Sequence, residues 1–311
     1  MIDLHCDTFF ELMRREGEEL RENSLCVDLR KLKHAGSMVQ MFACFLYAEE
    51  FKEIGGYSKA YERALEIITY AKEQFDKNDD TISLVRNWEE VEHNTCVGKM
   101  SAILTIEEGG ILEGDISRLE HLYQEGIRLM TLTWNYENCI GYPNKMSGGL
   151  KSFGIEVVKR MNELGMLIDV SHLSDQGFWD VIEYSSKPIV ASHSNARSIC
   201  NHARNLTDEM IKALAEQGGI AGINFYPYFV RENGVSSADD LAEHVAHMYR
   251  VGGEDCIAIG TDFDGFDEGV TEIEHIGEMN LFYEAIKRKG FTERQIEKIW
   301  YQNAERLLKD L

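Results

Sequence analysis

Eight short apolar runs, rich in β-branched residues, alternate with helix-period stretches along the whole sequence. The helix-period stretches carry mixed charge, and several end in glycine, the usual C-terminal stop of a helix. This alternation predicts parallel strands joined by crossover helices. The predicted strands are Ile2–Cys6, Met38–Leu46, Ser101–Ile106, Arg128–Thr133, Met166–Val170, Pro188–Ser192, Gly219–Asn224 and Cys256–Gly260.

Eight strand–helix units are what a (β/α)8 barrel of the TIM type requires, and such a barrel needs about 250 residues. The chain has 311 residues. The surplus fits loops and a C-terminal helical extension with the sequence FTERQIEKIWYQNAERLLKDL. No linker-like stretch interrupts the chain, which predicts a single α/β barrel domain over residues 1–311. A doubly wound parallel sheet is the alternative, because it is built from the same alternation of elements.

The charge of the chain limits its partners. The sequence holds 54 acidic and 32 basic residues, a formal net charge of −22 at pH 7. Such a surface repels nucleic acids and anionic membranes, so neither is expected as a partner. The seven cysteines include no C-x-x-C pair, which argues against a disulfide framework. Met1 leads directly into a predicted strand without the segments of a signal peptide, so we expect a cytoplasmic protein.

Residues that bind metals follow five of the eight predicted strands. In a (β/α)8 barrel the carboxyl ends of the strands form the active site. Histidines and carboxylates with no required cysteine suit zinc or a similar divalent ion. The set is too large for one tetrahedral ion and fits two metals about 3.5–4 Å apart, bridged by a carboxylate. These residues are His5, Asp7, Glu107, Glu108, His172, His193, Asp262 and Asp264.

Each of these residues also has a structural interpretation. A single histidine at a strand end is more often a structural residue, and the D-x-D of TDFDG is typical of a turn or a helix cap. The combination is more specific, because random placement does not collect ligands at one rim of a barrel. Most of the other histidines are expected at the solvent-exposed surface: His34, His93, His121, His244, His247 and His275.

Six motifs run in order along nearly the whole chain: DLHCDT, EEGG, LIDVSHLS, SHSNARSICNHARNLTD, GINFYP and GTDFDG. The second histidine of the central pair follows the first by 21 residues, and the Arg of ARN comes 11 residues later. In these motifs the chain resembles the renal (membrane) dipeptidase family, the dizinc branch of the amidohydrolase-like barrels.

The resemblance implies two zinc ions per chain, bridged by one carboxylate. The implied bridging residue is Glu108, which directly precedes the Gly pair. Its neighbour Glu107 is a rival, but adjacent residues at a strand end point in opposite directions, and the Glu-Gly-Gly spacing of the family favours Glu108. The other implied ligands are His5 and Asp7 for one ion and His172 and His193 for the other.

The resemblance also implies how the reaction proceeds. Zinc lowers the pKa of water from 15.7 to about 7, so a metal-bridging hydroxide attacks the scissile carbonyl. Asp262 matches the acid/base that takes the water proton and passes it to the leaving amine. Arg204 matches the arginine that grips the carboxylate of a short substrate. Tyr226 is expected either to line the substrate pocket or to be an ordinary packing aromatic.

One position departs from the family pattern. Well-known members carry a histidine after the fourth strand that helps to stabilise the tetrahedral intermediate, and this chain has Trp134. An indole N–H can donate a hydrogen bond but cannot become cationic. Oxyanion stabilisation is then left to the zinc, to Asn135 or to Tyr136. Trp134 is expected to contact substrate or simply to wall the pocket.

Three functions are compatible with these residues. The leading hypothesis is a zinc-dependent dipeptidase that hydrolyses small dipeptides, those with a C-terminal D-residue included. The alternative is a related dizinc amidohydrolase acting on another carboxylate-bearing amide, such as an N-acyl amino acid or a β-lactam. A non-catalytic binding barrel is the third, and the retention of Asp262 with every expected ligand argues against it. The family resemblance also implies a homodimer.

Overall fold

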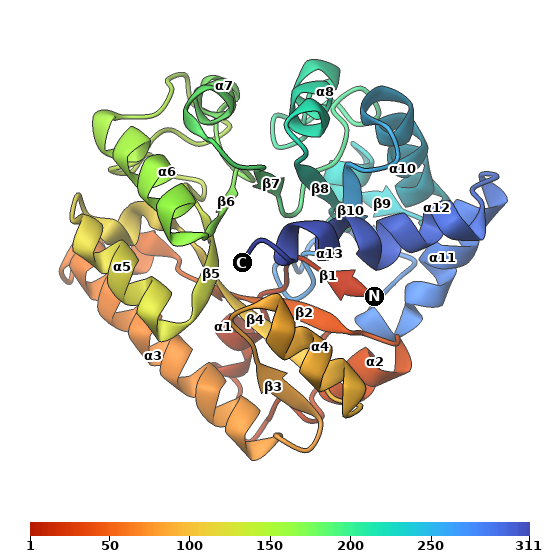
Figure 1. Ribbon diagram of the computed structural model, residues 1–311, viewed down its shortest axis with the longest axis horizontal. Helices are drawn as coiled ribbons and strands as arrows, with labels where there is room; N and C mark the ends of the chain where they lie inside the picture. The colour runs from red at the N-terminus through yellow and green to blue at the C-terminus, as the bar shows by residue number, and fades with distance from the viewer.

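Eight parallel strands close into a barrel surrounded by helices in the computed structural model, which describes residues 1–311 (Figure 1). Neighbours around the ring run β2-β1-β10-β8-β7-β6-β5-β4, and the pairing of β2 with β4 closes it. This closure confirms the predicted (β/α)8 fold and excludes the doubly wound sheet, which has free edges. The strands are β1 (Ile2–Asp3), β2 (Val39–Phe45), β4 (Met100–Glu107), β5 (Ile127–Thr131), β6 (Leu167–Asp169), β7 (Val190–Ala191), β8 (Ile220–Ile223) and β10 (Ile257–Ile259).

The helices form a ring outside the strands (Figure 1). Many begin at a side chain that caps the first turn, as Ser174 does for α7 and Thr207 for α8. The α-helices are α1 (Thr8–Leu12), α2 (Leu29–His34), α3 (Gly56–Lys77), α4 (Trp88–Cys96), α5 (Ile116–Glu125), α6 (Ser152–Leu164), α7 (Asp175–Tyr184), α8 (Asp208–Glu216), α9 (Pro227–Val230), α10 (Ala238–Gly252), α11 (Met279–Arg288), α12 (Glu293–Glu297) and α13 (Asn303–Leu308). The remaining helical turns are η1 (Ala48–Phe51), η2 (Gly109–Leu112), η3 (Ile276–Glu278) and η4 (Lys298–Gln302).

Three short strands were not predicted. β3 (Ile82–Leu84) pairs with the first residues of β4, from Met100 to Ala102. β4 is longer than its neighbour β5, whose pairing with it begins only at Leu104, so β3 occupies the free stretch. β9 (Val235–Ser236) and β11 (Val270–Thr271) form a separate two-stranded parallel ribbon.

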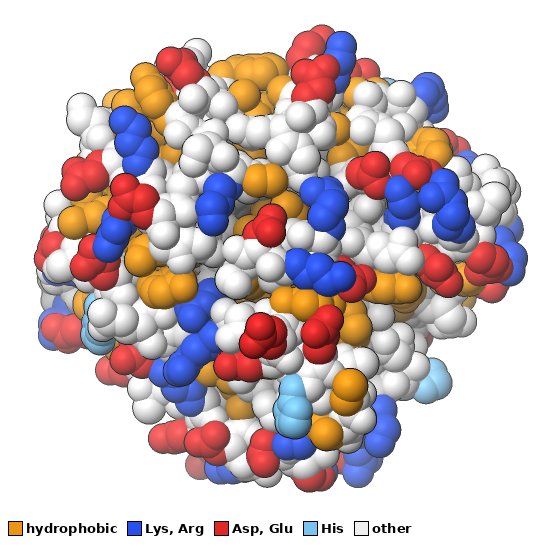
Figure 2. Space-filling view, in the orientation of Figure 1, with side chains coloured by type: hydrophobic (Ala, Val, Ile, Leu, Met, Phe, Trp, Pro, Cys, Tyr) orange, Lys and Arg blue, Asp and Glu red, His pale blue; other side chains and the backbone are white.

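An inner apolar cluster fills the amino-terminal half of the barrel. Each of the eight strands, or the residue that follows it, contributes at least one side chain to this cluster, and the extension adds Ala304, Leu307 and Leu308. α13 therefore covers the amino end of the barrel, which faces the viewer in Figure 1. Figure 2 shows this face with acidic and basic side chains interspersed. The strand residues of the cluster are Ile2, Leu4, Val39, Met41, Ile103, Leu129, Leu167, Val190, Ile220 and Ala258.

His244 corrects one of the predictions of exposed histidines. It lies on α10 and is fully buried. Its Nδ1 accepts from the backbone N–H of Ala196, and its Nε2 donates to the carbonyl of Val230. Burial lowers the pKa of His244 to about 4, so the ring is neutral and ties α10 to the loop at Ala196 and to the end of α9. None of the helices combines the length and the apolarity needed to cross a lipid bilayer.

Candidate active site

Five side chains of the metal-binding type meet at the carboxyl end of the barrel. Nε2 of His5 lies 3.3 Å from Oδ2 of Asp7 and 3.4 Å from Oε2 of Glu107. Nε2 of His172 lies 3.1 Å from Oε1 of Glu107 and 3.1 Å from Nε2 of His193. These spacings match the roughly 3.3 Å between ligand atoms of a tetrahedral zinc site with bonds of 2.0–2.1 Å. The donor set therefore fits bound metal ions.

Glu107 lies between two groups of ligands. Its Oε2 faces His5, whereas its Oε1 faces His172 and lies 3.6 Å from Nε2 of His193. Oδ1 of Asp7 is buried and has no hydrogen-bond partner, which leaves a second donor atom on the His5 side. The carboxylate of Glu107 is therefore shared by two sets of side chains, His5 with Asp7 and His172 with His193.

The expectation that Glu108 bridges the metals is wrong, because its carboxylate points away from the cluster. It accepts from the backbone N–H of Gly110 at 2.7 Å, which caps η2, and from Nδ2 of Asn138 at 2.6 Å. The register of β4 explains the difference. Ile103 belongs to the inner apolar cluster, and Glu107 lies four residues further on the same face of the strand, whereas Glu108 follows on the other face.

The electrostatics of the cluster favour cations. Burial holds the pKa of His172 and His193 well below the usual value, so both rings are neutral and can offer a lone pair to a metal. Burial and the nearby Asp7 raise the pKa of Glu107 to about 8. Burial opposes a charge on His5, but Asp7 and Glu107 outweigh it and raise its pKa. Buried carboxylates that need a positive partner to ionise are typical of metal sites.

Backbone strain is concentrated at this rim. His172 has a φ of 68°, Asp262 of 62°, Asp264 of 66° and Glu108 of 103°, all in the left-handed region that non-glycine residues rarely adopt. Glu113, at 50°, is the remaining non-glycine example in the chain. Such conformations persist where the surroundings impose them, and they are most common at functional sites.

Asp262 reaches the same cluster from the end of β10. Its Oδ1 lies 3.8 Å from Nε2 of His5, and its Oδ2 accepts from Nδ2 of Asn224 at 2.9 Å. Burial raises the pKa of Asp262 to about 6. One oxygen is thus held by an amide, and the other faces the ligands.

Arg204 is a buried cation with open hydrogen-bonding positions. It is only 4% exposed, and its one side-chain hydrogen bond runs from Nη1 to Oγ of Ser194 at 2.6 Å. Nε and Nη2 have no partner. A buried guanidinium with unpaired N–H groups is costly unless an anionic ligand binds it.

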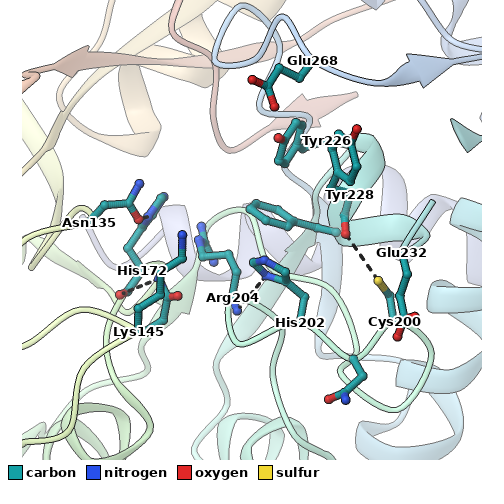
Figure 3. Close-up of a pocket in the computed structure, with 13 residues that line it drawn as sticks. Asn135, Lys145, His172, Cys200, His202, Arg204, Tyr226, Tyr228, Glu232 and Glu268 are labelled. Atoms are coloured by element: carbon teal, nitrogen blue, oxygen red, sulfur yellow. Dashed lines mark hydrogen bonds between the residues drawn. The ribbon is translucent and has the colours of Figure 1, made fainter. Parts of the chain in front are cut away.

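A cavity of about 970 Å³ opens onto the cluster, and an adjoining one of about 430 Å³ contains Arg204 (Figure 3). His172, Asn135 and Tyr226 line both. Trp134 lines the larger cavity, where its ring centroid lies 6.2 Å from that of His172. The structure therefore places the predicted pocket residues Trp134 and Tyr226 at the pocket wall.

A family model described as membrane dipeptidase (peptidase family M19) matches residues 1–311. The chain belongs to the membrane dipeptidase family. It is a metal-dependent hydrolase, and the cluster at the barrel rim offers the side chains that could hold the metal.

Relatives support the assignment. The chain is 30% identical over 93% of its length to an uncharacterised dipeptidase of Schizosaccharomyces pombe, of which the match covers 73%. A solved metallopeptidase called dipeptidase AC superimposes with a TM-score of 0.91 at 24% identity, covering 99% of this chain and 97% of the other. A solved Rhodobacter sphaeroides metallopeptidase is liganded with a phosphinate mimic of the dipeptide L-Ala-D-Ala. It superimposes with a TM-score of 0.90 at 23% identity, and the match covers 99% of this chain and 98% of the other. These two structures share the fold.

Beyond its ligands, this membrane dipeptidase family member has a buried support that sequence reasoning missed. Oγ of Ser192 lies 2.7 Å from Nδ1 of His193 and 2.6 Å from Oδ2 of Asp169. Asp169 also accepts from the hydroxyl of Thr131 and from the backbone N–H groups of Ser171 and Ser192. The serine hydroxyl donates to Asp169 and accepts from His193, which leaves Nε2 of His193 free to bind a metal. In the sequence, Ser192 directly precedes His193 in VASH, and Asp169 stands three residues before His172 in LIDVSH.

Replacing Asp169 with asparagine should weaken metal affinity by roughly 10- to 100-fold, the range for partners that orient a metal-binding histidine. The amide cannot accept all four hydrogen bonds, so Ser192 loses the partner that directs its hydroxyl. Zinc titration against a competing chelator measures the effect. Asp115→Asn, at the exposed cap of α5, is the matched control and should titrate like the wild type. Equal zinc affinity in both variants would exclude this role for Asp169.

Proposed function

We propose that the protein is a dizinc dipeptidase that hydrolyses small dipeptides with a free C-terminal carboxylate. One observation carries this proposal. The ligand cluster around Glu107 borders one cavity, and the buried guanidinium of Arg204, with its unpaired N–H groups, borders the adjoining one. His172 lines both cavities. A substrate that places an amide at the ligand cluster and a carboxylate at Arg204 fits this arrangement. A dipeptide is the smallest peptide with this spacing.

The residues divide into two zinc sites. His5 and Asp7 would hold one ion, His172 and His193 the other, and Glu107 would serve both through its two oxygens. Bound there, zinc supplies a water of lowered pKa and polarises the scissile carbonyl. The same assignment leaves Glu108 with a structural role.

Asp262 is the proposed acid and base. Asn224 fixes its Oδ2, so Oδ1 is the oxygen that accepts the proton of the attacking water. The same oxygen then delivers that proton to the amine of the leaving residue. Its raised pKa, about 6, favours both steps near neutral pH, because the proton is neither lost nor held too strongly.

Asn135 is the proposed hydrogen-bond donor to the oxyanion, because Trp134 cannot supply the positive charge of the histidine that it replaces. Its Oδ1 accepts from Nδ1 of His172 at 3.2 Å, which directs the amide NH₂ elsewhere, and the residue lines both cavities. Tyr136 is a poorer candidate, since it lines neither cavity.

The role of Arg204 predicts a dependence on the free carboxylate. We expect kcat/KM for a dipeptide to exceed that for its C-terminal amide by about 10²-fold, because the amide leaves a buried guanidinium unpaired. Arg204→Met should lower turnover of the free dipeptide and remove this preference. Initial rates on L-Ala-L-Ala, L-Ala-D-Ala and their amides measure both. Equal rates on acid and amide by the wild type would contradict the assignment.

The same assay separates the other functions. A preference for N-acyl amino acids or β-lactams over every dipeptide would favour the related amidohydrolase. Absence of turnover by zinc-loaded protein on all three classes would favour a binding barrel.

A further inference from the structure

Lys145 is a second cation without a partner in the cavity that contains Arg204. Its ammonium group makes no ion pair and no hydrogen bond in the structure, although the chain carries 54 acidic residues against 32 basic ones. Most other lysines pair with a carboxylate, as Lys151 does with Glu137 at 2.7 Å. An unpaired lysine at the wall of a pocket in so acidic a protein indicates a ligand of negative charge.

The loop that carries Lys145 is tied to the ligand cluster. The backbone N–H of the preceding residue, Asn144, donates to the carbonyl of His172 at 2.7 Å, and Pro143 bridges to Leu173. The backbone next to Lys145 is therefore held close to that of His172. Burial lowers the pKa of His202, and the charges of Lys145 and Arg204 both lower it further, so the two cations face the same part of the cavity.

The acidic residues of the cavity lie elsewhere. In Figure 3, Lys145 lies with His172 and Arg204, whereas Glu268 lies beyond Tyr226 and Glu232 lies with Cys200. Neither of these two carboxylates therefore pairs with Lys145, whereas Arg204 faces the buried carboxylates of Asp262, Asp169 and Glu107 from its other side. An anion that binds between Lys145 and Arg204 is attracted by both charges.

We propose that Lys145 is a substrate-binding residue that contacts, together with Arg204, the free C-terminal carboxylate of the dipeptide. This rests on the proposed function. Arg204 offers Nε and Nη2 from the buried side, and Lys145 reaches the same carboxylate from the exposed side as a flexible point charge. The substrate carboxylate is then held by two cations rather than one.

Lys145→Met tests the proposal, because methionine keeps an apolar stem and loses the charge. We expect KM for free dipeptides to rise about five- to tenfold with kcat within twofold, since a half-solvated contact stabilises bound substrate and transition state alike. Lys145→Arg should restore KM to within about twofold. The difference in KM between Lys145→Met and the wild type should be smaller in high salt, because salt screens an exposed charge. Lys187→Met, at another exposed lysine without an ion pair, is the matched control and should not change KM.

Three results would overturn the proposal. One is an unchanged KM in Lys145→Met, and another is a rise in KM that is as large for dipeptide amides as for free dipeptides. The third is a loss confined to dipeptides that end in Asp or Glu, which would place Lys145 at the substrate side chain instead.

Calorimetry separates this proposal from the proposed function. The probe is a phosphinate mimic of a dipeptide, with and without its C-terminal carboxylate, bound to zinc-loaded protein. If the wild type hydrolyses no dipeptide, the proposed function fails. The Lys145 contact is then decided by whether Lys145→Met weakens binding of the carboxylate form alone, by about five- to tenfold.

Discussion

Replacing Glu107 with glutamine is expected to lower kcat/KM for dipeptides by at least about 10³-fold, because metal ions supply several kcal/mol of transition-state stabilisation. The amide has one oxygen where the carboxylate has two, so it cannot face both His5 and His172 as an acceptor. The loss of its negative charge would also leave the two proposed zinc ions with less charge compensation. Zinc content measured on the purified variant should fall below that of the wild type.

Glu108→Gln is the matched control, one residue away. Its side chain accepts from Gly110, Asn138 and Trp134, outside the ligand cluster. The glutamine side chain has only one oxygen and cannot accept all three hydrogen bonds. The free energy of unfolding should therefore fall by about 1–3 kcal/mol. Its zinc content should match the wild type. Loss of zinc in Glu108→Gln with retention in Glu107→Gln would restore the assignment that the structure contradicts.

The barrel itself was predictable from the sequence. All eight strands lie where the apolar runs predicted them, because parallel strands are buried on both faces and read as continuous apolar segments. β3, β9 and β11 were missed because strands of two or three residues leave no periodic pattern. It remains a prediction that the chain forms a single domain, that it is a homodimer and that it is located in the cytoplasm.

Because the strands are buried on both faces, the sequence could not decide between Glu107 and Glu108. In β4 all eight residues are buried, so the sequence does not mark which face points into the barrel. Only the packing of Ile103 in the inner cluster sets the register. That His5, His172 and His193 meet in one cluster was predictable, because each histidine stands alone at its strand end. Their role as metal ligands stays a prediction. Asp169 and Lys145 were not predictable, since their roles depend on partners from other elements.

Asp262→Asn should lower kcat by roughly 10²- to 10⁴-fold, the range for loss of a general acid and base. The carbonyl oxygen of asparagine can still accept from Asn224, so the side chain keeps its place. Its NH₂ then stands where Oδ1 stood, and it cannot accept a proton from water. KM and zinc content should be close to those of the wild type. Zinc lost from the variant would instead identify Asp262 as a ligand, because its Oδ1 lies 3.8 Å from Nε2 of His5.

The pH dependence of the wild type gives the second measurement on Asp262. In the proposed role, activity requires the ionised carboxylate of Asp262. Burial raises the pKa of this carboxylate to about 6, whereas bound cations lower it. The rate should therefore fall as the pH decreases through a value at or below about 6. The residual activity of Asp262→Asn should lack this acid limb. Asp264→Asn, in the same D-x-D, should keep it, because Asp264 only accepts from Thr8 and from the backbone of Cys26. If both variants keep the acid limb, the titrating group is not Asp262 and the proton must pass through another residue of the cluster.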